Sequence, residues 1–368
     1  MTTNSLICQL ISANTNTWRD SMAKKHIDCK DNGPYTIFNY NAQECDFTDP
    51  VVQEARGIII DIPRLEVVCW PFRKFGNYSE SYADEIDWSS ARVQTKIDGS
   101  IVKLWWSKRD DEWVWSTNSC IYAEDASTFD YLTFCDVIYR AFERSPVYFD
   151  RLNKNHTYMF ELVSPVTQVV IYYPVADLWH IGTRDNVSGQ ELIEDIGIHR
   201  PKEYPLHSLS QCIEAANELN RGLDSVQNEG FVVVDKNWHR IKVKSPEYFV
   251  AHKLDTAKPE AVKKLILNCL LNNEKALNLC HEPALSYYRY WLEELKCQIQ
   301  ACIDSAREIY KEVNYDRKAA AELIKQERFS DCGFKAIDNA EFDASMAIDT
   351  MTQKRLCNYI PTYRRPTF

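Results

Sequence analysis

The sequence of 368 residues contains no apolar run long enough to cross a membrane, and its thirteen cysteines form no Cys-x-x-Cys pair. Its eight histidines show no spacing typical of metal ligands, so neither a disulfide framework nor a zinc site is expected. The first residues, Met1 to Ser5, lack the basic and then apolar stretches of a secretory signal. Together these absences predict a soluble protein of the cytoplasm with reduced thiols.

The chain also lacks a net positive charge. Its formal net charge of −10 argues against a protein that coats nucleic acid indiscriminately, because contacts with phosphates supply most of the non-specific affinity. Residues 351–368, however, contain no acidic residue. We expect the basic residues there either to contact a phosphate backbone or to belong to a solvated terminal tail. These residues are Lys354, Arg355, Arg364 and Arg365.

The chain is long enough for two domains that each bury a core. Between residues 35 and 245, short runs rich in β-branched and aromatic residues predict strands, and apolar residues at intervals of three and four predict helices near 129–143 and 209–219. This pattern predicts an α+β domain built on antiparallel sheet. The predicted strands include residues 36–40, 57–60, 67–70, 113–115, 158–162, 169–173, 231–234 and 240–244.

The pattern changes after Pro246. An apolar stripe from Leu285 to Ala306 predicts a long helix, and another helical segment is expected to begin at Ala261. No strand pattern follows, so the second domain is expected to be all-helical. The predicted domains are residues 1–252 and 253–368.

A lysine with a short following motif stands between two strand-like stretches, as Lys96-Ile97-Asp98-Gly99. A lysine amine can attack the α-phosphorus of a nucleoside triphosphate only when it is deprotonated, so burial and neighbouring cations are expected to lower the pKa of Lys96. Gly99 would allow the tight backbone path that brings the strand up to a nucleotide. Asp98 would orient the amine or the sugar. Alone, so short a motif is weak evidence.

Two cations and two carboxylates elsewhere in the first domain suit the same chemistry. Arg56 begins a strand and Lys74 follows the next one, so both could face a triphosphate, although strand-end cations are often merely exposed. Glu161 lies inside an apolar run, and a buried carboxylate is costly unless it is paired or used. It is therefore expected either to contact a sugar or a metal ion, or to form a structural ion pair. Glu229 begins an apolar strand, where it could bind magnesium directly or through water.

A pair of lysines completes this group. Lys242 and Lys244 are two residues apart on a predicted strand, so both amines lie on the face opposite Ile241 and Val243. Two like charges side by side repel unless an anion lies between them, and an α-phosphate is the anion expected at this pair. A solvated pair on an edge strand is the alternative.

In this order, the motifs resemble the covalent nucleotidyltransferase superfamily of ligases and capping enzymes. More narrowly, six segments resemble the T-even phage RNA ligase 1 family in composition and spacing, and the resemblance covers roughly residues 35 to 250. It implies an antiparallel-sheet nucleotidyltransferase domain of the ATP-grasp-like ligase type. The all-α C-terminal domain that follows is expected to select the RNA, because it offers exposed helix faces and the basic cluster near the C-terminus. The six segments are residues 37–40, 55–58, 73–75, 96–100, 160–165 and 242–245.

The resemblance implies ATP-dependent sealing of the 5′-phosphate and 3′-hydroxyl ends of RNA, with nicked tRNA as a candidate repair substrate. ATP and Mg²⁺, or Mn²⁺ in its place, would serve as cofactors. Neither a membrane nor an obligate protein partner is implied, and a phage-encoded member would act in the host cytoplasm. The RNA contacts would include Lys354, Arg355, Arg364 and Arg365. Carried over by position, the resemblance makes Lys96 the nucleophile that carries AMP, with Lys242 and Lys244 as the other catalytic residues. The metal ligands would be Glu161 and Glu229. Further contacts with ATP would be made by Tyr40, Arg56, Lys74 and Asp98.

One departure from the family pattern concerns triphosphate binding. The family usually offers a lysine in a strand after the nucleophile motif, but residues 115–119 contain none. Either Asn118 makes a neutral contact with the phosphates, or another cation such as Lys103 takes the place of the lysine.

Two alternatives to an RNA ligase stay open at this point. A DNA ligase or an mRNA guanylyltransferase of the same superfamily would place a small β-barrel after the lysine pair, and the helices predicted there count against both. The second alternative is a nucleotide- or RNA-binding relative that has lost catalysis, although the expected active-site residues are otherwise present.

Overall fold

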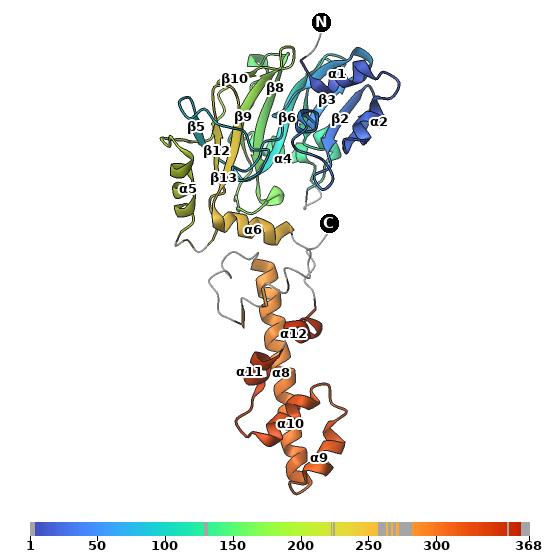
Figure 1. Ribbon diagram of the computed structural model, residues 1–368, viewed down its shortest axis with the longest axis vertical. Coiled ribbons are helices and arrows are strands. Elements are labelled where there is room, and N and C mark those ends of the chain that lie inside the picture. Colours follow the sequence, from blue (N-terminus) through green and yellow to red (C-terminus); the bar gives the residue numbers. More distant parts are fainter. Residues whose placement is uncertain are drawn as a thin grey trace. The chain divides into compact units, whose positions relative to one another are not determined.

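The chain forms two compact units, of which the first reaches Phe249 and the second begins at Val250 (Figure 1). The predicted boundary lies slightly further along the chain, inside helix α6 (Pro246–Thr256). Each unit has a hydrophobic core of its own. The computed structural model describes residues 4–128, 132–221, 223, 225–256, 263, 266, 267, 270, 271, 282–351 and 353–361.

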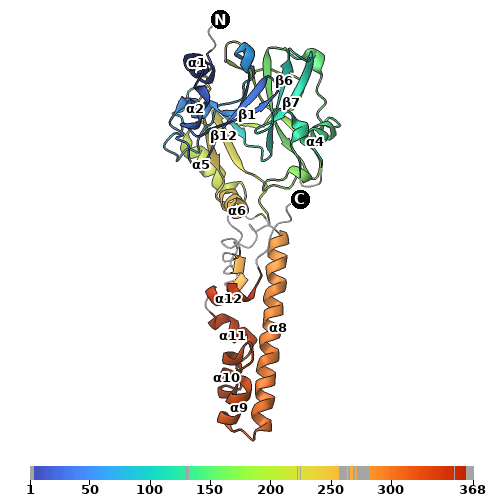
Figure 2. The same ribbon diagram turned by 90° about the vertical axis from the view of Figure 1, so that its right-hand side faces the viewer.

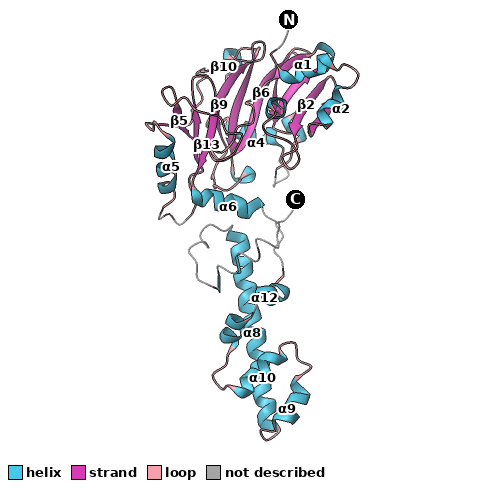
Figure 3. Ribbon diagram, in the orientation of Figure 1, coloured by secondary structure: helices cyan, strands magenta, loops and turns pink. Residues whose placement is uncertain are grey.

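The first unit contains three antiparallel sheets, and all of the described strands belong to it (Figure 3). The N-terminal sheet has the strand order β1-β2-β3-β4, and three helices cover one of its faces. Its strands are β1 (Ile27–Asn32), β2 (Tyr35–Tyr40), β3 (Arg56–Asp61) and β4 (Glu66–Cys69). The helices are α1 (Leu6–Ala13), α2 (Trp18–Ala23) and α3 (Pro50–Glu54), and the short 3₁₀ helix η1 (Ile62–Arg64) joins β3 to β4.

Alternation along the strands sends neighbouring residues of the N-terminal sheet to opposite cores. Phe38 and Ile58 pack in the core that the helices cover. Ile37 and Ile59 pack against Trp105, which belongs to the central sheet of the unit. The N-terminal sheet is therefore buried on both faces, which explains why its strands are so rich in apolar residues.

The central sheet has the order β10-β9-β8-β6-β7, and its outer face is covered by α4 (Phe134–Ala141), as Figure 2 shows. Leu104 and Phe160 of the sheet pack there against Val137 and Ile138 of α4. The strands are β6 (Ser100–Ser107), β7 (Glu112–Thr117), β8 (His156–Val163), β9 (Asp177–Asp185) and β10 (Glu191–Leu192). Short 3₁₀ helices are η2 (Ala123–Asp125), η3 (Phe149–Arg151) and η4 (Pro165–Thr167).

The third sheet has the order β11-β5-β12-β13, and we call it the lysine sheet because it carries Lys242 and Lys244. Val93, Phe231 and Val243 on one face pack against α5 (Leu209–Glu218). The two lysines lie on the opposite face, as a period of two residues requires. The strands are β5 (Arg92–Thr95), β11 (Glu203–Tyr204), β12 (Gly230–Val234) and β13 (Arg240–Lys244).

The prediction of a strand over residues 169–173 is wrong. The segment follows η4 and has no regular structure, although its β-branched and aromatic residues are typical of a strand. The backbone N–H groups of Val170 and Ile171 donate to the carboxylate of Asp98, at 2.9 and 2.6 Å. Because these N–H groups are bonded to the buried carboxylate, they cannot donate to a neighbouring strand. The local preference of the segment for a strand is therefore overridden.

The described part of the second unit contains helices and the turns between them, and no strand. Its longest helix, α8 (Glu282–Glu312), covers the predicted apolar stripe, and α9, α10 and α11 pack along it (Figure 2). Leu295 and Ile299 of α8 share a core with Phe329 and Ile348. Of the helix expected to begin at Ala261, the first residue falls outside the described part of the chain, but the described residues 263, 266, 267, 270 and 271 are helical. No described helix is long and apolar enough to cross a membrane. The shorter helices are α9 (Arg317–Ile324), α10 (Ser330–Asp338), α11 (Ala344–Thr350) and α12 (Gln353–Tyr359).

Gly230 is the position of the lysine sheet that tolerates a side chain least. Its φ is 139°, and a Cβ there would lie 2.2 Å from the carbonyl oxygen of Val243. We expect Gly230→Ala to lower the free energy of unfolding by about 2–4 kcal/mol, because it strains the backbone and displaces that carbonyl group. The measurement is urea unfolding.

The matched control is Gly33→Ala. Gly33 also has a positive φ, 59°, but no atom lies within 4 Å of the added Cβ. Gly33→Ala should therefore lower the free energy of unfolding by only roughly 1–2 kcal/mol, the penalty for an L residue in the left-handed conformation. Equal losses in the two variants would mean that the close approach at Gly230 is unimportant.

Candidate active site

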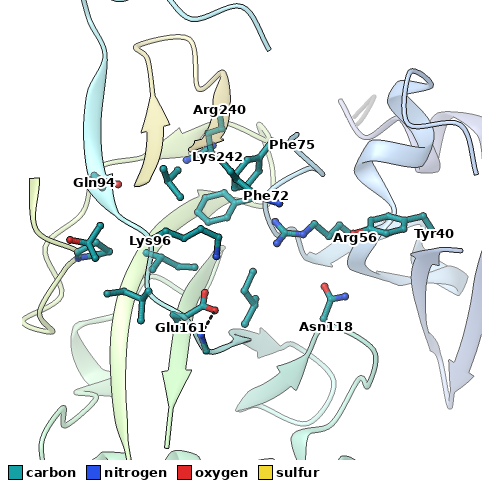
Figure 4. Close-up of a pocket in the computed structure, with 17 residues that line it drawn as sticks. Tyr40, Arg56, Phe72, Phe75, Gln94, Lys96, Asn118, Glu161, Arg240 and Lys242 are labelled. Carbon is teal, nitrogen blue, oxygen red and sulfur yellow. Dashed lines mark hydrogen bonds between the residues drawn. The ribbon is translucent and has the colours of Figure 1, made fainter. Parts of the chain in front are cut away.

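A cavity of about 320 Å³ opens where the three sheets of the first unit meet (Figure 4). Its size suits a small molecule, and apolar side chains such as Ile97 and Ile181 line it together with cationic ones. From the N-terminal sheet and the segment after it come Tyr40, Arg56, Phe72 and Phe75. The central sheet and its loops add Ile101, Asn118 and Glu161, and the lysine sheet and its flanks add Gln94, Lys96, Val232, Arg240 and Lys242.

Lys96 is ion-paired with a buried carboxylate. Its backbone N–H, directly after β5, donates to the carbonyl oxygen of Gly230 at 2.8 Å, which holds this segment against the start of β12. The Nζ atom of Lys96 lies 2.8 Å from one oxygen of Glu229, and Nζ of Lys244 lies 2.9 Å from the other. Glu229 is 2% exposed, so one buried carboxylate bridges two ammonium groups.

This arrangement contradicts the prediction that the pKa of Lys96 is lowered. Burial does act downward, but the carboxylates of Glu229 and Glu161 outweigh it and raise the pKa of Lys96 above its usual range. For Glu229, burial acts upward, but Lys96 and Lys244 outweigh it and lower the pKa of Glu229. The prediction assumed that neighbouring cations act on Lys96, whereas carboxylates make the largest electrostatic contributions to its pKa.

Lys242 is the lysine whose pKa is depressed. Its Nζ lies 4.7 Å from the centre of the Phe75 ring, and no carboxylate among the described residues forms an ion pair with it. Burial, followed by the charges of Arg56, Lys74 and Lys96, lowers the pKa of Lys242 to about 6. An anion that entered the cavity would therefore favour uptake of a proton by Lys242.

Glu161 lies below Lys96 in Figure 4 and is 8% exposed. One of its oxygens accepts a hydrogen bond from the backbone N–H of Gly99 at 3.2 Å. Burial raises the pKa of Glu161 to about 7, with Lys96 acting against it and Glu229 reinforcing it. Glu161 can therefore gain or lose a proton near neutral pH.

Of the two predicted metal ligands, Glu161 fits a divalent cation better than Glu229. Both oxygens of Glu229 contact lysine amines, whereas one oxygen of Glu161 forms no hydrogen bond with a described residue. In the described part of the chain, no three His, Cys, Asp or Glu side chains gather where a metal ion could sit. A cation held by Glu161 would need further ligands from a bound phosphate and from water, which is how proteins usually bind Mg²⁺.

Of the three predicted contacts from the N-terminal sheet and the segment after it, two reach the cavity. Arg56 points its guanidinium group into it, 5.5 Å from the centre of the Phe75 ring, and Tyr40 lies beside Arg56 (Figure 4). Lys74 does not line the cavity, because its Nζ lies against two rings, 5.5 Å from the centre of Tyr40 and 4.8 Å from that of Phe47. Burial, reinforced by the charge of Arg56, lowers the pKa of Lys74.

Asp98 does not line the cavity either, and its contact with a nucleotide stays a prediction. The side chain is 3% exposed, and its carboxylate accepts hydrogen bonds from the N–H groups of Val170 and Ile171 and, at 2.7 Å, from the hydroxyl of Tyr248. Strand alternation would place Asp98 on the same face as Lys96, but β5 ends before Lys96. Asp98 instead holds the loop after β8 and the first turn of α6.

Comparison with known proteins decides the family. A family model described as RNA ligase matches residues 54–257, which is more than half of the chain. The chain belongs to the T4 RNA ligase 1 family. One relative is named "Putative bifunctional polynucleotide kinase/RNA ligase", from Autographa californica nuclear polyhedrosis virus, and is 27% identical over 317 residues. Another is an RNA ligase of Rhodothermus phage RM378, 23% identical over 361 residues.

These matches differ in how much of each relative they cover. Both cover 80% of this chain, but they cover 43% of the baculovirus protein and 81% of the phage protein. Similar solved structures include an archaeal ATP-dependent RNA ligase, 14% identical with a TM-score of 0.43 over 70% of this chain and 68% of that one. A Naegleria gruberi RNA ligase with PPi is 17% identical, with a TM-score of 0.34 over 45% and 52%. With TM-scores below 0.5, these two likenesses add nothing to the argument.

This RNA ligase family member has no lysine over residues 115–119, and the structure separates the two candidates to replace it. Asn118 lines the cavity. Lys103 is fully buried, and its Nζ donates to the carbonyl oxygen of Gly57; burial lowers the pKa of Lys103. Lys103 therefore does not reach the cavity, and Asn118 is the side chain available there.

Arg240 is a residue of the RNA ligase cavity that sequence reasoning missed. Its guanidinium group forms two hydrogen bonds with Glu191, at 2.9 and 2.6 Å, and lies 4.2 Å from the centre of the Phe72 ring. A signal was present, since Arg240 is two residues before Lys242 and alternation puts both on one face of β13. Phe72 and Gln94 gave no such signal, because nothing in their local pattern separates a cavity wall from a core.

The predicted RNA contacts near the C-terminus are described only at Arg355. Its guanidinium group forms a bidentate ion pair with Asp331, at 2.6 and 2.7 Å, within the second unit. The side chains of Lys354, Arg364 and Arg365 fall outside the described residues. Their role in this RNA ligase family member stays a prediction.

The depressed pKa of Lys242 predicts a pH-dependent effect on stability. In an unfolded chain a lysine has a pKa of about 10.4, whereas the pKa of Lys242 in the folded protein is about 6. Between these values the unfolded chain binds more protons at this site, so the contribution of Lys242 to stability rises with pH. We expect Lys242→Met to be more stable than the wild type at pH 7, by a margin that shrinks at pH 9.

Urea unfolding at both pH values tests this expectation. Lys30→Met serves as the control, because Lys30 is an exposed lysine of β1. A margin for Lys242→Met that is the same at pH 7 and pH 9 would contradict the depressed pKa.

Proposed function

We propose that this chain is an ATP-dependent RNA ligase that seals 5′-phosphate and 3′-hydroxyl ends of RNA. The observation that carries the proposal is that Lys96, Lys242 and Arg56 line one cavity, with Glu229 buried between Lys96 and Lys244. Membership of the RNA ligase family supports it. No described feature favours a DNA ligase, an mRNA guanylyltransferase or an inactive relative.

Lys96 is the proposed nucleophile. Its Nζ would attack the α-phosphorus of ATP, so that a P–N bond forms, the bond to the bridging oxygen breaks and pyrophosphate leaves. AMP would pass from Lys96 to the 5′-phosphate of the RNA, and the 3′-hydroxyl would then displace AMP as the new phosphodiester forms. Before the first step Lys96 must lose its proton, because only the neutral amine is a nucleophile.

Lys242 and Arg56 are the proposed phosphate contacts, with Tyr40 beside them. Because Lys242 gains a proton as an anion enters, its charge would be present when negative charge develops on the transferred phosphate. Lys244 would act by holding the Glu229 carboxylate, and Lys74 by supporting Tyr40. Preorganised cations of this kind, in a partly dry site, are the usual electrostatic contribution to phosphoryl chemistry.

Glu161 is the proposed ligand for Mg²⁺, or for Mn²⁺ in its place, together with phosphate oxygens. A bound ion would offset the negative charge that raises the pKa of Lys96 and the charge of the phosphoryl group that Lys96 attacks. Glu229 would join the ligands only after releasing one of its lysines, since both of its oxygens are in contact with amines.

The second unit is the part that we propose to select the RNA. All of the residues assigned to chemistry lie in the first unit, before Val250. The phosphates of a folded RNA, such as a nicked tRNA, would be contacted by basic side chains of the second unit. Those side chains are Lys354, Arg355, Arg364 and Arg365.

Self-adenylylation is the direct test of the proposed chemistry. Incubation with α-labelled ATP and Mg²⁺ should leave label on the protein, and α-labelled GTP should not. Lys96→Ala should lose the label while it is still folded at the assay temperature, although its free energy of unfolding should be lower because the buried Glu229 carboxylate then keeps only one lysine. Lys30→Ala, which changes an exposed lysine of β1, should label normally. Labelling by GTP instead of ATP would favour a guanylyltransferase, and labelling of Lys96→Ala would remove Lys96 from its role.

Pre-adenylylated RNA separates the nucleophile from the phosphate contacts. Lys96→Ala should still seal such RNA, because the P–N bond is no longer needed. Lys244→Ala should lose both self-adenylylation and this sealing step, because its charge, beside Lys242 on β13, is needed in every step in which negative charge develops on the transferred phosphate. If Lys96→Ala and Lys244→Ala are equally inactive in sealing pre-adenylylated RNA, this division of roles is wrong.

A further inference from the structure

A second cavity, of about 350 Å³, adjoins the active-site cavity at Lys242, which lines both. It lies between β13, α5 and the first turn of α6, elements that lie beside one another in Figure 1. Ile213 and Ala216 of α5 and Val243 of β13 make its lining largely apolar. The chemistry proposed above uses none of this space.

Tyr78 is an exposed aromatic residue in the wall of this cavity, with 41% of its surface accessible. Its position is fixed through the backbone, because residues 76–78 run beside β13. The N–H of Lys242 donates to the carbonyl oxygen of Gly76 at 2.9 Å, and the N–H of Tyr78 donates to the carbonyl oxygen of Lys242 at 3.0 Å. A substitution of the Tyr78 side chain leaves both of these hydrogen bonds in place.

The polar groups of the lining also suggest a ligand. The Oδ1 atom of Asn77 is buried and has no hydrogen-bond partner among the described residues, which is costly unless a ligand supplies a donor. The acidic residue of the lining, Glu80, already accepts hydrogen bonds from the N–H of Asn77 and the hydroxyl of Tyr82. Lys242, which has no ion pair with a described residue, is therefore the charge that an incoming anion would meet.

We propose that this cavity binds the terminal base of the 5′-phosphorylated RNA strand, stacked on Tyr78; the proposal rests on the ligase function. The 5′-phosphate must come to Lys242 to receive AMP, so the base of the same nucleotide comes within reach of the cavity that shares this lysine. Stacking on an aromatic ring accepts any base, and the Asn77 oxygen can accept a hydrogen bond from an amino or imino group. The 3′-hydroxyl strand carries no terminal phosphate to match Lys242.

The test compares Tyr78→Ala with wild type on two pre-adenylylated RNA strands, one complete and one whose 5′-terminal nucleotide lacks its base. On the complete strand, we expect Tyr78→Ala to lower kcat/KM for sealing about tenfold, a typical loss for one base–aromatic stack. When the terminal base is missing, kcat/KM of the wild type should fall by a similar factor. For Tyr78→Ala, removal of the base should lower kcat/KM only slightly further. Tyr78→Phe should seal like the wild type, since it keeps the ring.

Two further measurements separate stacking from a general defect. Self-adenylylation of Tyr78→Ala should fall much less than sealing, because no RNA takes part in it. Tyr139→Ala is the matched control, since Tyr139 is 56% exposed on α4 and lines neither cavity. Its sealing rate should depend on the terminal base as that of the wild type does.

Several outcomes would overturn the proposal. These are equal losses of self-adenylylation and sealing in Tyr78→Ala, an undiminished dependence on the terminal base in that variant, and a dependence on the base of the 3′-hydroxyl strand instead. A wild-type protein that never becomes adenylylated would instead overturn the ligase function. The two failures are therefore distinguishable.

Discussion

The buried carboxylate of Glu229 is the group on which the geometry of this site depends. It precedes Gly230, whose carbonyl oxygen accepts the backbone N–H of Lys96 and whose partner across the β12–β13 ladder is Lys244. One strand end therefore positions two amines around one carboxylate. Removing either lysine would leave a buried charge incompletely balanced, at a cost of several kcal/mol, so the strand pairing and the ion pairs stabilise each other.

The lysines of the site differ because their nearest charges differ. The carboxylates beside Lys96 raise its pKa, whereas burial beside Arg56 and Lys74 lowers the pKa of Lys242 to about 6. Lys96 is thus held in position with its proton, and Lys242 is left ready to take one up with an anion. Without a bound anion, the uncompensated positive charge around Lys242 destabilises the folded protein. Such a loss of stability is expected of a site that is organised to bind phosphate.

Local sequence patterns were sufficient for the features that depend on neighbouring residues. Alternation along β13 placed Lys242 and Lys244 on one face, and the apolar stripe after Leu285 became α8. Features set by residues far apart in sequence were beyond such patterns. Asp98 binds the backbone of a loop 72 residues away, which undoes the predicted strand at 169–173, and the pKa of Lys96 depends on Glu229, 133 residues away.

The measurement that tests the central claim most directly is peptide mapping of the AMP adduct by mass spectrometry after incubation with ATP and Mg²⁺. If deprotonation alone chose the nucleophile, Lys242 would be preferred, because its pKa is about 6. We infer instead that position chooses it, so that the nucleophile is the amine that Glu229 holds at the cavity. AMP is therefore expected on Lys96, and AMP on Lys242 or Lys244 would contradict this claim.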